Sequence, residues 1–312
     1  MFWSILLLSV ALAASVLQRL GPPRAVVTAS APVEVAAAAP PVDGLRVPRP
    51  ALLEPSLAVP GAMLPRVGPD GTLPRVAYAR PSPVTDRPRV ALVLSGLGLS
   101  EADSIAAIRA LPPTVTLAIS PYASNAAPVL DLARAHGNEL LATVPMEAEG
   151  ADSAGRRALM TGASAEDNRI NLEWALGRTQ GYAGVTGAGD NGLRGERFAA
   201  QISSFKAMLE EVSRRGLYYL DPRPGGPDLP LALPHATVSA VADDRPARDE
   251  FEDKLAAIEA MARERGFAIA LAGPPRRATV ERLVAWAGLL KQRGFVMVPV
   301  SALVQVPVAD EP

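Results

Sequence analysis

The chain contains no cysteine and only two histidines, His136 and His235. Without cysteine it can form neither disulfide bonds nor zinc–thiolate sites, and it has no thiol nucleophile. Two histidines are few for a hydrolytic metal centre, because most such centres use imidazole ligands. His136 ends a predicted helix, where a cation favours the helix dipole. His235 precedes a predicted strand at the rim opposite the expected active face, so we interpret both histidines as structural.

An excess of positive charge is also lacking. Lys and Arg number 31 and Asp and Glu number 32, which gives a formal net charge of -1. Proteins that bind nucleic acid usually carry a basic surface, because they neutralise phosphate groups. We therefore expect no nucleic-acid partner.

The N-terminal apolar run, residues 2–17, is shorter than the roughly 20 residues that an untilted membrane helix requires. Ala11-Leu12-Ala13 matches the small-x-small pattern of a signal-peptide cleavage site. However, no Lys or Arg precedes the run, and Arg19 follows it. Residues 1–20 are therefore predicted to be a signal peptide or a membrane anchor. Either predicts a periplasmic or inner-membrane-anchored protein, and the sequence leaves cleavage, or a start further upstream, open.

A proline-rich segment follows, since 15 of the 31 prolines lie between Gly21 and Pro88. Residues 21–62 are predicted to be a disordered Pro/Ala-rich spacer. Residues 63–87 carry apolar and aromatic side chains such as Leu64 and Tyr78, so we expect them to lean on the domain, although a plain linker remains an alternative. Residues 308–312 are predicted to be a tail.

Between residues 88 and 307, short apolar runs alternate with helical patterns, which predicts a parallel α/β sheet. The strand-like runs are Val90–Leu94, Val115–Ile119, Glu139–Val144, Tyr182–Thr186, Leu217–Leu220, Ala236–Val241, Ala268–Leu271 and Phe295–Val300. Eight strands in this length favour a complete or deformed (β/α) barrel. An open dinucleotide-binding sheet is disfavoured, because Gly96-Leu97-Gly98 lacks the third glycine of that fingerprint. Helix starts are predicted at Ser100, at the capping box from Ser164 and at Thr279.

The first predicted strand ends in an uncharged turn, Ser95-Gly96-Leu97-Gly98. Barrel enzymes place their chemistry at this carboxyl end of the strands. Here the position offers only a hydroxyl group and backbone amides.

The order of the motifs resembles that of the divergent polysaccharide deacetylases. The elements that carry the resemblance include Leu117-Ala118-Ile119-Ser120-Pro121-Tyr122, Val144-Pro145-Met146-Glu147, Val185-Thr186-Gly187-Ala188-Gly189, Gly216-Leu217-Tyr218-Tyr219-Leu220-Asp221 and Val298-Pro299-Val300-Ser301. The resemblance implies a deformed (β/α)7–8 barrel and a cell-envelope location linked to carbohydrate metabolism. In the wider superfamily it also implies metal-dependent removal of acetyl groups from glycans.

Such hydrolysis uses a divalent metal held by one Asp and two His, with a carboxylate base. Where active members of the family carry two consecutive Asp residues, this chain has Ser95-Gly96. The positions of the two His ligands fall at Ala188 and Gly273, and Thr143 stands where another His often occurs. The resemblance thus implies that the metal-ligand positions are lost, and we expect neither a metal nor another cofactor.

Three acids remain at strand ends, Glu147, Asp221 and Asp243. They are weak candidates for catalysis, and oxygen ligands of this kind can hold a hard cation. Each has a structural alternative: Glu147 as a brace for its loop, Asp221 as part of an Asx-type turn, and Asp243 as part of a solvated charge cluster.

A ligand-binding rim is predicted at the same strand ends. Arg194 and Arg223 are suited to an anionic or hydroxyl-rich ligand, because guanidinium groups donate several hydrogen bonds. The candidate ligand-binding residues are Ser95, Glu147, Asp190, Arg194, Asp221 and Arg223.

Two functions from different classes remain open. In the first, the chain is a catalytically degenerate envelope protein that keeps the barrel and binds a glycan or an envelope protein. In the second, it is an active metal-dependent carbohydrate deacetylase with a carboxylate site rearranged around Glu147, Asp190, Asp221 and Asp243. The sequence predicts neither the identity of the ligand nor the oligomeric state.

Overall fold

A curled parallel sheet forms the centre of the domain, and every pairing among its strands is parallel. The computed structural model describes residues 48–150, 155–189, 193–244 and 248–307. The sheet strands are β3 (Arg89–Leu97), β4 (Thr116–Ile119), β5 (Leu140–Thr143), β6 (Gly184–Thr186), β7 (Tyr218–Asp221), β8 (His235–Thr237), β9 (Ala240–Val241), β10 (Phe267–Ala272) and β11 (Val296–Met297). They coincide closely with the strands predicted from the sequence.

The sheet closes on itself through residues 235–241. The strand order is β8-β7-β6-β5-β4-β3-β10-β9, so the consecutive strands β8 and β9 lie at opposite ends of the order. The change of partner falls between two neighbouring residues. The amide of Val238 donates to Asp221 O on β7, at 2.9 Å, and the amide of Ser239 donates to Ile269 O on β10, at 2.8 Å. The predicted deformed (β/α) barrel is therefore confirmed.

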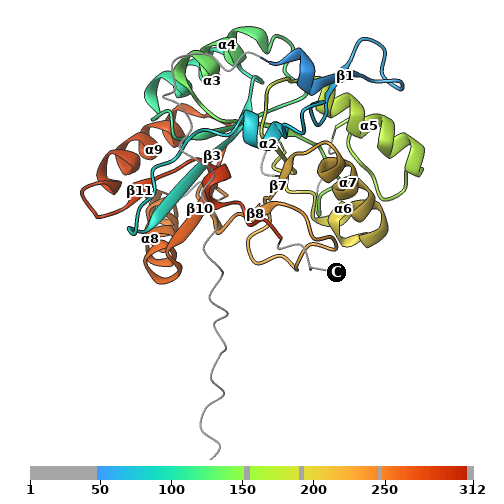
Figure 1. Ribbon diagram of the computed structural model, residues 1–312. Coiled ribbons are helices and arrows are strands. Elements are labelled where there is room, and N and C mark those ends of the chain that lie inside the picture. The colour runs from blue at the N-terminus through green and yellow to red at the C-terminus, as the bar shows by residue number, and fades with distance from the viewer. Residues whose placement is uncertain (1–47, 151–154, 190–192, 245–247, 308–312) are drawn as a thin grey trace, which may run out of the picture. The chain divides into compact units, whose positions relative to one another are not determined.

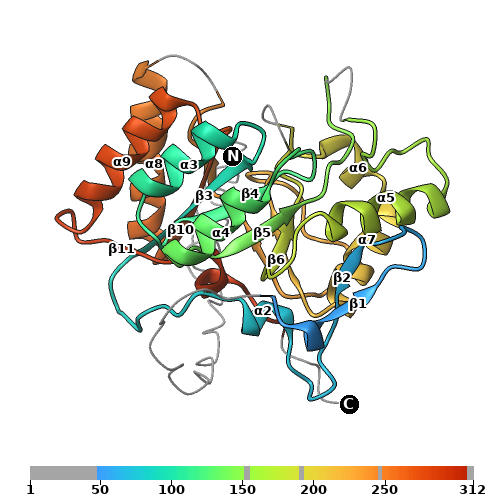
Figure 2. The ribbon, with the colours of Figure 1, turned by 90° about the horizontal axis from the view of Figure 1, so that it is seen from above.

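Helices surround the strands (Figures 1 and 2). They are α3 (Glu101–Ala110), α4 (Ala127–His136), α5 (Ala165–Gly177), α6 (Glu196–Ala200), α7 (Ile202–Arg214), α8 (Arg248–Arg265) and α9 (Arg277–Leu290). The alternation of strand side chains explains the two cores. Val90, Leu92 and Leu94 pack with the helices, whereas Ala91 and Val93 belong to the cluster inside the barrel. None of these helices, among the residues described, is long and apolar enough to cross a membrane.

Two of the three predicted helix starts are confirmed. The Ser100 side chain accepts a hydrogen bond from Asp103 N, and that of Ser164 accepts one from Asp167 N. The third prediction is wrong, because α9 begins at Arg277 and Thr279 lies inside its first turn. The hydroxyl group of Thr279 instead donates to the carboxylate of Asp243, at 3.4 Å.

The N-terminal extension begins earlier than expected. We expected a disordered spacer to residue 62, but the structure describes η1 (Pro50–Leu52), β1 (Leu53–Pro55), β2 (Met63–Pro65) and α2 (Pro74–Ala77). Leu52 is buried, Glu54 pairs with the buried Arg215 at 3.0 Å, and Ser56 donates to Glu173 at 2.5 Å. These contacts offset the entropy lost on ordering a Pro-rich segment. The segment before residue 48, including the predicted signal peptide or anchor, lies outside the described residues.

A buried carboxylate ties several parts of the chain together at the amino end of the barrel. Glu139 is only 1% exposed. Its Oε1 accepts hydrogen bonds from Tyr218 OH on β7 at 3.0 Å and from Ser301 N at 3.1 Å, and its Oε2 accepts one from Arg80 N at 3.0 Å. Ser301 belongs to η3 (Val300–Leu303), whose apolar residues join the core inside the barrel. Burial raises the pKa of Glu139, although these hydrogen bonds oppose the shift.

We predict that Glu139→Gln lowers the free energy of unfolding by about 1–3 kcal/mol, because one amide cannot accept hydrogen bonds at both of its ends. A carboxyl group whose pKa is raised by folding contributes most stability below its ordinary pKa and loses that contribution as the pH rises through the folded pKa. The difference between wild type and variant should therefore shrink as the pH rises above the ordinary pKa of a Glu carboxyl group. Urea unfolding at several pH values measures it.

Glu281→Gln is the matched control, because that exposed carboxylate makes only a surface pair with Arg277. We expect a change of less than about 0.5 kcal/mol. If the loss of unfolding free energy in Glu139→Gln does not depend on pH, this account of the amino end of the barrel is wrong.

Candidate functional site

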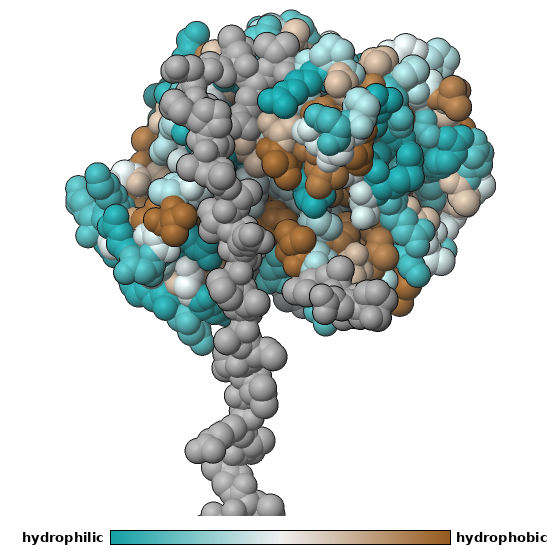
Figure 3. Space-filling model, viewed as in Figure 1, coloured by the Kyte–Doolittle hydropathy of each residue, from teal (hydrophilic) through white to brown (hydrophobic). Residues whose placement is uncertain are grey.

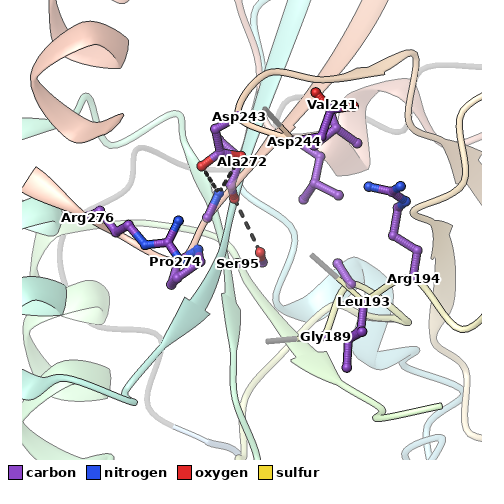
Figure 4. Close-up of a pocket in the computed structure, with 13 residues that line it drawn as sticks. Ser95, Gly189, Leu193, Arg194, Val241, Asp243, Asp244, Ala272, Pro274 and Arg276 are labelled. Atoms are coloured by element: carbon purple, nitrogen blue, oxygen red, sulfur yellow. Dashed lines mark hydrogen bonds between the residues drawn. The ribbon is translucent and has the colours of Figure 1, made fainter. Parts of the chain in front are cut away.

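A pocket opens at the carboxyl ends of the strands (Figure 4). Its volume is about 130 Å³, enough for several water molecules or a small part of a ligand. Its walls come from the ends of β3, β9 and β10 and from the loops after β6 and β10. The lining residues are Ser95, Ala188, Gly189, Leu193, Arg194, Val241, Asp243, Asp244, Leu271, Ala272, Gly273, Pro274 and Arg276.

The three positions assigned to lost metal ligands meet in this pocket. Ser95 lies near the carboxyl end of β3, Ala188 follows β6 and Gly273 follows β10, and all three line the cavity. They are far apart in sequence, and only the closed sheet brings them together. Thr143, at the end of β5, lies beside them, because its hydroxyl group donates to Ala188 O at 3.5 Å.

The turn after β10 packs directly on the end of β3, where the pairing of β3 with β4 shifts register between Leu94 and Leu97. Gly273 has φ +134°, and a Cβ atom there would overlap the carbonyl oxygen of Ser95 and lie 2.8 Å from Ser95 N. Gly96 has φ +73°, and its Cβ would lie 3.0 Å from Pro274 Cβ. Side chains at 96 and 273 would therefore need both an unfavourable backbone conformation and space that backbone atoms already fill.

Asp243 is held by the same turn. Its two carboxylate oxygens accept from Gly273 N at 3.2 and 3.0 Å, and Thr279 also donates to it. Burial raises the pKa of Asp243, whereas hydrogen bonds from Gly273 and Thr279 and the charge of Arg276 lower it. The Ser95 hydroxyl donates to Ala272 O at 3.3 Å. The hydrogen bonds of Ser95 and Asp243 therefore stabilise the contact between the end of β3 and the turn after β10.

These residues do not fit a catalytic divalent metal. The side-chain oxygen atoms of Ser95, Asp243 and Thr143 at these positions all take part in hydrogen bonds within the protein. Neither imidazole is near, because His136 ends α4 and His235 begins β8 at the amino end of the barrel. Across the parts of the chain that the structure describes, no three His, Asp or Glu residues are grouped so that they could bind a metal.

Asp221 and Arg223 form a pair of their own outside the pocket lining. The guanidinium of Arg223 donates to both carboxylate oxygens of Asp221, at 2.9 and 2.7 Å, and Arg223 N donates to Oδ1 at 3.0 Å. The turn predicted at Asp221 is therefore present, with Arg223 as its partner. Arg223 also lies 5.2 Å from the centre of the Phe205 ring. Both side chains are buried, and this pair is satisfied internally.

Glu147 braces its loop. It accepts hydrogen bonds from Thr161 Oγ1 at 2.6 Å and Thr161 N at 2.7 Å, and it pairs with Arg197 on α6 at 3.0 Å. The hydrogen bonds from Thr161 hold the pKa of Glu147 below its usual range. Like Asp221, Glu147 does not line the pocket, so the three candidate acids do not share it.

Ser95, Arg194 and Asp243 are the predicted candidates that reach the pocket. Asp190 lies outside the described residues. The sequence reasoning missed Arg276 and Asp244. Arg276 stands three residues after Gly273, directly before α9, and a search for basic residues after each strand would have found it.

Comparisons with known proteins identify the family. Residues 92–304 match the profile of the divergent polysaccharide deacetylases. The crystal structure of the uncharacterized protein ATU2773 from Agrobacterium tumefaciens is 31% identical and covers 78% of this chain and 100% of its own, with a TM-score of 0.72. The catalytic domain of a peptidoglycan N-acetylglucosamine deacetylase from Eubacterium rectale is 10% identical and covers 75% and 97%, with a TM-score of 0.45. No curated protein matches the chain significantly.

The profile match spans more than half of the chain and nearly all of the barrel, from β3 to η3. The chain belongs to the divergent polysaccharide deacetylase family.

Proposed function

We propose that this protein is a catalytically degenerate member of its family that binds a glycan in the pocket without hydrolysing it. One observation carries the proposal: the three positions where the family resemblance places metal ligands meet in one pocket, where they present a hydroxyl, a methyl group and a bare backbone. A metal-activated water molecule is the nucleophile of this chemistry, so hydrolysis would lack its central component.

The pocket retains the features of a carbohydrate site. Polar groups at its edge come from Arg194, Arg276 and Asp244. An apolar wall is formed by Val241 and Leu271. Sugars present hydroxyl groups along their edges and C–H groups on their faces, and binding sites combine a few oriented polar groups with apolar walls. The family name itself points to polysaccharide.

The surface supports a glycan rather than a protein as the ligand. On the face shown in Figure 3, hydrophobic residues are interspersed with hydrophilic ones. Protein docking sites usually present a contiguous apolar patch. The large apolar side chains that are exposed in the described part of the chain come from different loops and helices: Leu57, Val76, Val84, Leu99, Met160, Ile202, Leu289 and Val306.

The proposed location is the cell envelope, either in the periplasm or anchored to the inner membrane. The apolar residues 2–17 and the Pro/Ala-rich spacer after them support it. A glycan of the envelope would then be within reach of the domain.

We predict that the purified protein releases no acetate from N-acetylated chito-oligosaccharides, with or without added Zn²⁺, Mn²⁺ or Co²⁺. Elemental analysis should find less than stoichiometric metal. Metal-dependent acetate release would instead establish the alternative, an active deacetylase with a rearranged carboxylate site.

We predict that Leu193→Trp weakens binding of glycan fragments by at least about tenfold, because the larger side chain fills the pocket. Isothermal titration calorimetry with envelope glycan fragments measures it. Leu289→Trp is the control, since Leu289 lies on α9, is 40% exposed and does not line the pocket. Equal affinities of the two variants would exclude the pocket as the binding site.

The junction behind the pocket yields a stability prediction. Gly273→Ala should lower the free energy of unfolding by about 3 kcal/mol or more, because the methyl group overlaps Ser95 and the backbone conformation is strained. Gly288→Ala, in the exposed part of α9 with nothing within 4 Å of its Cβ, should raise it by about 0.5–1 kcal/mol. Thermal and urea unfolding of both variants checks the pair, and a neutral Gly273→Ala would disprove the packing argument.

A further inference from the structure

The pocket carries two guanidinium groups that the family resemblance does not explain. Arg194 comes from the loop after β6, and Arg276 comes from the loop after β10. Figure 4 shows them on opposite sides of the cavity, with Ser95 between them. A ligand in the pocket therefore has a cation on each side.

The carboxylates of the pocket form their hydrogen bonds and ion pairs with groups other than the two arginines, although the charge of Arg276 lowers the pKa of Asp243. Asp243 accepts from Gly273 N and Thr279, as described above. Asp244 faces Lys254 of α8 at 3.9 Å. Neither hydrogen bond nor ion pair joins these acids to Arg194 or Arg276 within the described residues. The two acids thus leave the arginine donors available.

Both arginines keep most of their hydrogen-bonding capacity. Arg194 uses its Nε to contact Glu196 at 3.2 Å, and its two terminal nitrogen atoms donate to no described residue. The side chain of Arg276 is exposed and forms no ion pair within the described ranges. By contrast, Arg277 next to it is bound to Glu281 at 2.8 Å. Guanidinium groups of this kind bind a carboxylate through paired, charge-assisted hydrogen bonds.

We propose that the pocket recognises a sugar that carries a carboxylate, which Arg194 and Arg276 hold from opposite sides. This inference rests on the proposed glycan-binding function and names its ligand class. A neutral sugar would offer no charged partner to the terminal nitrogen atoms of Arg194 or to the guanidinium of Arg276. An acidic sugar supplies that charge, and its ring can lie against Val241 and Leu271.

Two sources supply this chemistry, a hexuronic acid and an amino sugar with a lactyl ether. An oligogalacturonate trimer and N-acetylmuramic acid represent them, and tri-N-acetylchitotriose is the neutral comparison. Calorimetric titration should give at least about tenfold tighter binding for one of the acidic probes than for the neutral one, and the difference should shrink at high salt. The acidic probe that binds identifies the source.

Arg276→Gln and Arg194→Gln should each weaken binding of the acidic probe about tenfold, because each removes charge-assisted hydrogen bonds. Arg277→Gln is the matched control and should change it less than twofold, since Arg277 does not line the pocket. Thermal unfolding of each variant confirms that it is folded.

The outcomes separate this inference from the proposed function. If the neutral probe binds as tightly as the acidic ones, and if Leu193→Trp weakens its binding, the glycan site is supported and the acidic-sugar inference is overturned. If Arg276→Gln behaves like Arg277→Gln, the inference is also overturned. If no probe binds, both proposals are overturned.

Discussion

At the amino end of the barrel, the carboxylate of Glu139 accepts hydrogen bonds from β7, η3 and the N-terminal extension. A buried charge without partners would be strongly unfavourable, so these segments must hold their positions together. Groups that are distant in sequence thereby fix the amino end of the barrel. In (β/α) barrels the amino ends of the strands usually contribute to stability, whereas residues at the carboxyl ends form the functional site and differ between proteins.

The carboxyl end shows how far that variation has gone. At the three positions aligned with metal ligands, the end of β3 and the turn after β10 contact each other through Gly96 and Gly273, and Asp243 accepts a hydrogen bond from the amide of Gly273. The strand ends are thus joined by direct contacts within the protein. The pocket in front of this junction has Arg194 and Arg276 at its sides, which is the basis of the proposed recognition of a charged ligand.

The barrel and its strands could be predicted from the sequence, because buried parallel strands such as β3 are nearly continuous apolar runs with distinctive neighbours. That Ser95, Ala188 and Gly273 come from the ends of different strands could also be predicted, because motif order places each of them at a strand end. Which of the candidate acids line the pocket could not be predicted. Whether Asp221 reaches the pocket or pairs with Arg223 depends on side-chain geometry. The ordered structure of residues 48–62 could not be predicted, because their proline content is typical of a disordered spacer. Contacts with distant residues such as Arg215 order this segment. Arg276 was missed because it matches no motif.

The left-handed conformation of Gly273 limits the side chains that position 273 can accept. A histidine introduced at this position would meet the backbone of Ser95 before it could reach a metal. A metal site built from positions 95, 188 and 273 would therefore require the backbone of the turn after β10 to rearrange as well as new side chains. A substitution at Gly273 alone would cost stability without creating such a site.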